Sequence, residues 1–145
     1  MATIIVRPLT FSRPLPHRTS TRRIVVHHTA GGDKTVERVH QIHLARGFDG
    51  IGYHFLIRHS GVIYQGRPIQ TVGQHARRAN SDSIAIALTG NFQITRPTEQ
   101  QLTSLRLLIL HIRQQYTHCV GLPVVRHSDV GATLCPGRNF PNMIF

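Results

Sequence analysis

Apolar residues are arranged along the chain in short runs and in two helical stripes. Four runs of aliphatic and β-branched residues predict strands, at 3–6, 24–27, 83–90 and 123–127. The run at 83–90 has so few polar positions that we expect it to be central in a sheet and covered on both faces. Segment 53–66 contains two further strand-like runs separated by Ser60 and Gly61, which predicts a hairpin.

The first helical stripe predicts a helix over 35–46 that ends at Gly47. Its apolar positions are Val36, Val39, Ile42 and Ala45. His40 and His43 lie three residues apart on this helix. Paired histidines without a third partner are typical of a polar helix surface, so we do not assign them to a metal site.

The second helix is the most clearly marked element. Thr98, with Gln101 three residues later, predicts a capping box at its start. One apolar stripe follows, made of Leu102, Leu105, Ile109, Ile112 and Tyr116. We expect this stripe to face the core rather than a partner protein.

These elements predict a single α/β domain with a mixed central sheet of about five strands, flanked by helices. Pro8, Pro14 and Pro16 exclude a helix from the start of the chain, so we separate an N-terminal lead-in segment, 1–22, from the domain at 23–145. A length of 145 residues suits one domain, and the sequence shows no internal repeat or linker.

The formal charge of +11 comes almost entirely from arginine, with Lys34 as the sole lysine. Such a surface favours anionic partners, either nucleic acid or the phosphate and carboxylate groups of a bacterial envelope. No nucleic-acid-binding motif accompanies the charge, which argues against nucleic acid. No run approaches the about 20 apolar residues of a membrane span, and the N-terminus lacks the features of a secretory signal.

The segment 126–137 contains the most informative chemistry. His127 and Cys135 are eight residues apart, and imidazole and thiolate both suit zinc. A catalytic zinc needs a third protein ligand, and the strand at 24–27 delivers His27 and the adjacent His28 at its end. Because successive strand side chains point to opposite faces, only one of these two histidines can reach a given metal.

Two other interpretations of Cys135 stay open at this point. The spacing also fits a surface histidine beside a small buried thiol, since free cysteine is often buried for packing alone. A disulfide with Cys119, the other cysteine in the sequence, would remove the metal ligand. Nothing else in the composition indicates a disulfide-rich scaffold.

Four blocks of the sequence resemble one enzyme family. They are VVHHTAG, GYHFLIRHSGVIYQGRP, VGQHARRANSDSIAIALTGNF and RHSDVGATLCPG, which together span about residues 22–138. In this order and at this spacing they resemble the zinc-dependent N-acetylmuramoyl-L-alanine amidases, the family of phage amidase lysozymes and peptidoglycan recognition proteins. The resemblance implies the α/β fold of that family for this chain.

The resemblance also implies roles for individual residues. The zinc ligands would be His27, His127 and Cys135. Tyr53 would be catalytic and lie beside the metal. Thr133 would also be catalytic, at a position where phage members carry lysine and catalytic recognition proteins tend to carry threonine. His75 and Asn80 would line the substrate cleft.

The implied reaction is hydrolysis of the amide bond between N-acetylmuramic acid and L-alanine in peptidoglycan, in which Zn²⁺ lowers the pKa of bound water to about 7 and polarises the carbonyl. Family members with an aspartate ligand also use a glutamate base on the strand that matches 83–90. This strand has no carboxylate here, so the resemblance assigns no general base. The alternatives are a peptidoglycan-binding protein without activity and, with less support, a basic nucleic-acid-binding protein.

The expected biological setting follows from the same resemblance. We expect a monomer that is made in the cytoplasm without a signal peptide and reaches the cell wall through a permeabilised membrane, as phage endolysins do. Its partner would be bacterial peptidoglycan, with the basic surface available to anionic envelope polymers.

Overall fold

The computed structural model describes residues 2–115, 121–143 and 145, and its sheet has six strands in the order β1-β4-β3-β5-β2-β6. The strands are β1 (Ile4–Ile5), β2 (Arg23–His28), β3 (Phe55–Ile57), β4 (Ile63–Gln65), β5 (Ser83–Leu88) and β6 (Val124–Arg126). Neighbouring strands pair in parallel except for the hairpin of β3 and β4. The expected mixed α/β sheet is confirmed, with six strands instead of about five, and β1 lies within the run at 3–6 that predicted a strand.

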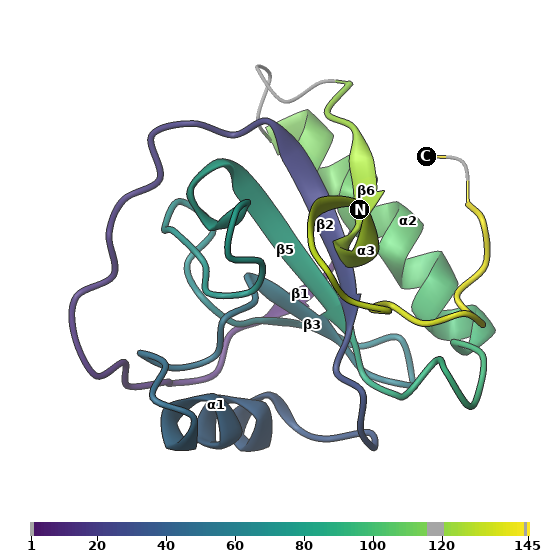
Figure 1. The fold of residues 1–145 in the computed structure, drawn as a ribbon, viewed down its shortest axis with the longest axis horizontal. Helices are drawn as coiled ribbons and strands as arrows, with labels where there is room; N and C mark the ends of the chain where they lie inside the picture. The colour runs from purple at the N-terminus through teal and green to yellow at the C-terminus, as the bar shows by residue number, and fades with distance from the viewer. Residues whose placement is uncertain (1, 116–120, 144) are drawn as a thin grey trace.

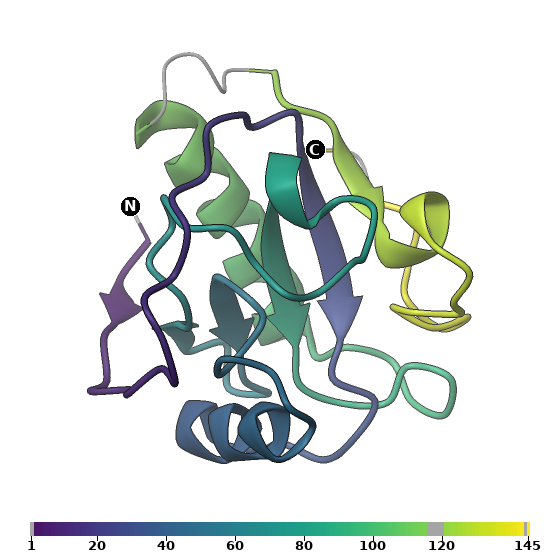
Figure 2. The ribbon, with the colours of Figure 1, turned by 60° about the vertical axis from the view of Figure 1, so that its left-hand side comes forward.

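The helices are α1 (Val36–Ala45), α2 (Glu99–Gln115) and the short α3 (His127–Val130), with one 3₁₀ turn, η1 (Asn80–Asp82). The ribbon shows α2 running along one face of the sheet (Figure 1). Seen from the side, β2 and β5 point toward α1, which lies beyond their carboxyl ends (Figure 2).

Alternation along the central strands separates two environments. Ile24 and Val26 of β2 pack with Ile86 of β5 in the large core cluster that includes α2. Val25 lies in a different cluster, on the opposite face of the sheet. His27 shares the face of Val25, because the two residues are two positions apart in one strand.

The capping box and core stripe predicted for α2 are confirmed. The Gln101 amide donates to Thr98 Oγ1 at 3.0 Å, and the Thr98 amide donates to Gln101 Oε1 at 3.0 Å. The buried stripe contains Leu102, Leu105, Ile109 and Ile112. Tyr116, the last predicted member of the stripe, lies outside the described residues. Gln101 is itself buried and its Nε2 donates to the carbonyls of Ile57 and Thr89, which ties α2 to β3 and the end of β5.

The buried face of α1 differs from the predicted one. It consists of Val36, Val39, His40 and His43, whereas the predicted Ala45 is exposed. The interpretation of His40 and His43 as polar surface is therefore wrong. Each imidazole accepts a backbone N–H through Nδ1 at 2.9 Å, His40 from Ile51 and His43 from Gly52. These bonds satisfy amides that would otherwise be buried without a partner.

The start of the chain is attached to the rest of the molecule. β1 pairs in parallel with β4, and Arg13 Nε donates to Asp49 at 2.7 Å. Further along, the Val72 amide donates to the Pro16 carbonyl at 2.9 Å. Within the described part of the chain, no helix has the length and apolar character needed to cross a bilayer.

Asp33 connects three loops at the carboxyl end of the sheet. Its Oδ1 accepts the Thr89 hydroxyl at 2.7 Å, the His59 amide at 3.0 Å and Arg58 Nε at 3.3 Å. Partial burial alone would raise the pKa of Asp33, but the hydrogen bonds from His59 and Thr89 outweigh it, and the pKa lies below its ordinary value of 3.8. Folding therefore favours the ionised carboxylate.

We expect acid to weaken the fold through Asp33. Its contribution to the free energy of unfolding is fully present above the unfolded-state pKa near 3.8 and is lost as pH falls through the lower folded-state pKa. Urea unfolding of the wild type and Asp33→Asn, compared between about pH 5 and pH 2.5, should show a shallower pH slope in the variant. Thr89→Val removes one hydrogen bond to the Asp33 carboxylate and should reduce the pH slope of stability in part. Identical slopes in all three proteins would contradict this role.

Candidate functional site

The end of β2 and the segment after β6 converge on one point. His27 is the penultimate residue of β2, and His127 directly follows β6. The parallel register pairs Val26 with Arg126, so His27 and His127 continue side by side from paired positions. Cys135 returns to the same place from beyond α3, and one ligand atom from each of these three residues lies within 4.8 Å of the others.

The individual atoms fit a zinc ion. Cys135 Sγ is 3.7 Å from His27 Nδ1. A tetrahedral zinc with ordinary bond lengths holds nitrogen and sulfur ligands about 3.3 to 3.6 Å apart. His127 Nδ1 is buried and has no hydrogen-bond partner among the described residues. A buried nitrogen left in this way needs an explanation, and metal ligation supplies one.

The electrostatics of these side chains also suit a cation. Burial, followed by the neighbouring His75 and His127, lowers the pKa of His27 well below its ordinary value, and burial lowers the pKa of His127. Both imidazoles are therefore neutral, as metal ligation requires. Burial raises the pKa of Cys135 to about 12, although the His28 amide partly offsets this by donating to Sγ at 3.3 Å. A bound cation would favour the thiolate.

The structure places His27, and not His28, in this cluster. The backbone N–H of Phe92 donates a hydrogen bond to His28 Nδ1 at 3.0 Å, and the centroids of the two rings are 5.8 Å apart. The His27 ring lies 4.5 Å from the His127 ring. Strand alternation thus assigns the two adjacent histidines to different partners.

An open cavity of about 580 Å³ lies over the cluster. Tyr53 lines it, with its ring centroid 5.1 Å from that of His27. Burial raises the pKa of Tyr53 above its ordinary value, so the hydroxyl stays protonated and can donate. His43 also lines the cavity, and because its Nδ1 accepts the Gly52 amide, its Nε2 carries the proton. Sequence reasoning missed His43.

His75 and Asn80 line the cavity, but their polar atoms also hold the protein together. His75 Nδ1 lies 2.9 Å from His27 Nε2, and His75 Nε2 lies 3.1 Å from Ser83 Oγ. Asn80 Oδ1 accepts the amides of His75 and Ala76, each at 2.8 Å. The Asn80 amide NH₂ group remains available to a ligand in the cavity.

Comparison with known proteins shows to which family the chain belongs. A family model described as N-acetylmuramoyl-L-alanine amidase matches residues 17–138. The chain belongs to this amidase family. The resemblance of the four sequence blocks is therefore confirmed.

Its relatives in the family include recognition proteins and phage enzymes. A peptidoglycan-recognition protein of Drosophila simulans is 37% identical over 129 residues, covering 83% of this chain and 71% of the relative. The endolysin of Klebsiella phage KP32 is 33% identical over 127 residues, covering 82% of each. Among solved structures, N-acetylmuramoyl-L-alanine amidase LysC from Clostridium intestinale URNW has a TM-score of 0.91 and 40% identity, covering 97% of this chain and 93% of LysC.

Thr133 lines the same cavity as His27, His127 and Cys135. Its Oγ1 accepts the Cys135 amide at 3.2 Å, which fixes the loop that carries the cysteine. The hydroxyl proton is still free to be donated elsewhere. Thr133 thus combines a hydrogen bond within its own loop with a place in the cavity lining.

Acidic side chains are absent from the lining of the amidase cavity among the residues that the structure describes. The charged groups there are basic, Arg46 and Arg77. The cavity lining therefore presents hydrogen-bond donors and positive charge. No carboxylate among these described lining residues can accept a proton.

Proposed function

We propose that the chain is a zinc-dependent amidase that hydrolyses the bond between N-acetylmuramic acid and L-alanine in peptidoglycan. The observation that carries the proposal is the convergence of His27, His127 and Cys135 beneath an open cavity. Three protein ligands leave one tetrahedral position free, which is characteristic of catalytic zinc sites. Membership of the amidase family supports the same reaction.

The side chains around the cluster suggest how the chain would assist amide hydrolysis. When bound, zinc supplies Lewis acidity, which acidifies water and polarises the scissile carbonyl. The protonated Tyr53 hydroxyl donates a hydrogen bond to the oxygen on which negative charge develops. His43 Nε2–H and the Thr133 hydroxyl provide further donors along the cavity wall.

The role of Tyr53 can be tested by removing only its hydroxyl. Tyr53→Phe should lower kcat about 10²- to 10³-fold, because one well-aimed donor to a developing oxyanion contributes this much. Activity would be measured as new L-alanine amino termini released from purified sacculi. Zinc content should equal that of the wild type, since Tyr53 is not among the ligands. A decrease below about tenfold would contradict the assigned role.

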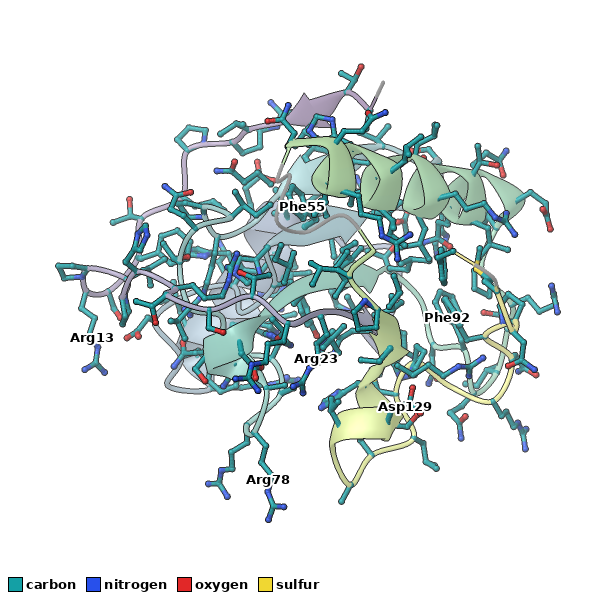
Figure 3. All side chains as sticks on the ribbon, turned by 90° about the horizontal axis from the view of Figure 1, so that it is seen from above. Arg13, Arg23, Phe55, Arg78, Phe92 and Asp129 are labelled. Carbon is teal, nitrogen blue, oxygen red and sulfur yellow. The ribbon has the colours of Figure 1, made fainter. Side chains whose placement is uncertain are left out.

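The basic surface next to the cavity supports a second part of the proposal, contact with anionic polymers of the envelope. A hollow of about 690 Å³ adjoins the cavity, sharing Arg77, His127 and Thr133 with it. Arg77 and Arg78 are both exposed at its edge, and Arg78 projects away from the body of the molecule (Figure 3). In this proposal the chain acts at the cell wall, as a phage-type lytic enzyme reaching it through a permeabilised membrane.

Peptidoglycan recognition without hydrolysis is the second candidate function. The observation that favours it is the cavity lining, which lacks a carboxylate among the described residues. Sacculi incubated with the zinc-loaded protein decide between the two. New L-alanine amino termini that disappear on chelation indicate the amidase, whereas binding to sacculi without such termini indicates recognition.

A further inference from the structure

His75 lies between a proposed zinc ligand and the sheet, and both of its ring nitrogens are engaged. His27 Nε2 is 2.9 Å from His75 Nδ1, and Ser83 Oγ is 3.1 Å from His75 Nε2. The rings of His27 and His75 meet edge to face, with centroids 4.9 Å apart and an interplanar angle of 85°. This geometry forms a continuous chain of hydrogen bonds from Ser83 to His27.

The donor and acceptor in each of these hydrogen bonds follow from the bond that Ser83 makes to Ala79. The Ser83 hydroxyl also lies 2.5 Å from the carbonyl of Ala79, and a carbonyl can only accept, so the single hydroxyl proton is committed there. Ser83 Oγ must then accept from His75, which places the proton of the neutral His75 ring on Nε2. His75 Nδ1 is left as an acceptor, and His27 Nε2 must donate to it.

This direction determines which nitrogen of His27 is free. A neutral imidazole has one N–H and one acceptor nitrogen, so a proton on Nε2 leaves a lone pair on Nδ1. Nδ1 is the atom that lies 3.7 Å from Cys135 Sγ within the ligand cluster. The opposite tautomer would direct an N–H at the metal position.

We propose that Ser83 and His75 are positioning residues that hold His27 in the one tautomer able to ligate zinc. The proposal rests on the proposed zinc function. It gives His75 a task inside the protein in addition to its place in the cavity lining.

The surrounding structure fixes the positions of Ser83, His75 and His27. Ser83 is fully buried and begins β5, where it pairs with Arg23 of β2, the strand that carries His27. Asn80 Oδ1 accepts the amides of His75 and Ala76, which fixes the backbone under the His75 ring. Donor, acceptor and metal ligand are thus attached to two adjacent strands and one short loop.

Two substitutions of His75 separate positioning from packing. His75→Leu removes both ring nitrogens, whereas His75→Asn can present Oδ1 near the former Nδ1 and accept from His27. Zinc affinity, measured by competition with a chelator, should fall about 10- to 100-fold in the leucine variant and recover most of that loss in the asparagine variant. A residue that only contacted substrate would change KM and leave zinc affinity unaltered.

Nitrogen NMR of the His27 ring in metal-free protein tests the tautomer directly. The wild type should show the proton on Nε2, and Ser83→Ala should give a mixture, because His75 Nε2–H loses its acceptor. Observation of Nδ1–H in the wild type, or equal zinc affinity in the wild type and a folded His75→Leu variant, would overturn the proposal. A wild type that binds no zinc would refute the proposed function. The tautomer of His27 measured in metal-free protein would still test whether Ser83 and His75 set it.

Discussion

Replacement of Cys135 by serine should remove bound zinc and lower the amidase rate about 10³-fold. Sγ is one of three ligand atoms in the cluster, and the two imidazoles alone cannot hold the ion in the same geometry. Metal catalysis contributes several kcal/mol to amide hydrolysis, and each 1.36 kcal/mol is a factor of about ten in rate. Metal analysis of the dialysed protein and release of L-alanine amino termini from sacculi would measure the two effects together.

His28→Asn is the matched control for this loss. His28 adjoins a ligand in sequence, but its ring accepts the Phe92 amide, and an asparagine Oδ1 can take over that bond. The control should therefore keep its zinc and most of its activity. Equal metal content in the wild type and Cys135→Ser would refute the proposed ligand set. Unfolding of both variants in excess chelator shows whether a difference in fold stability contributes.

Replacement of Arg67 by methionine should lower the free energy of unfolding by about 3 kcal/mol, because each buried acceptor left without a donor costs about 1 to 3 kcal/mol. Arg67 is 1% exposed and donates to the Ile51 carbonyl at 2.7 Å and to the Val72 carbonyl at 2.8 Å. Methionine fills much of the same space and donates nothing. Burial lowers the pKa of Arg67 only to about 10, so the guanidinium is charged at neutral pH.

Urea unfolding in excess chelator would measure the Arg67 effect independently of zinc. Arg38→Met on the exposed side of α1 is the control and should change the unfolding free energy by less than about 0.5 kcal/mol. A loss below about 1 kcal/mol in Arg67→Met would show that water or rearranged donors satisfy the two carbonyls.

Local patterns were sufficient for most of the fold. The capping box at Thr98 and the stripe from Leu102 to Ile112 predicted α2 correctly, because both signals are contained within a few turns of helix. The apolar strands and the hairpin turn at Gly61 were equally local. Strand order was not predictable in this way, since it depends on which distant segments pair.

The site was only partly visible in the sequence for the same reason. The stripe formed by Val36, Val39, His40 and His43 has regular helical spacing, but treating histidine as polar surface rotated the expected face toward Ile42 and Ala45. His43 was consequently missed as a cavity residue. The link between His75 and Ser83 depends on a loop folding back on β5, which no spacing rule reveals.

The parallel register of β2 and β6 has a consequence for how this family can diverge. Backbone pairing of Val26 with Arg126 sets the distance between His27 and His127, the two proposed histidine ligands, and the connecting segments do not. An insertion within β6 would send the following side chain to the opposite face of the sheet. An insertion at 131–132, in the exposed loop after α3, would not alter this pairing, so the loop can vary in length while the distance between His27 and His127 is preserved.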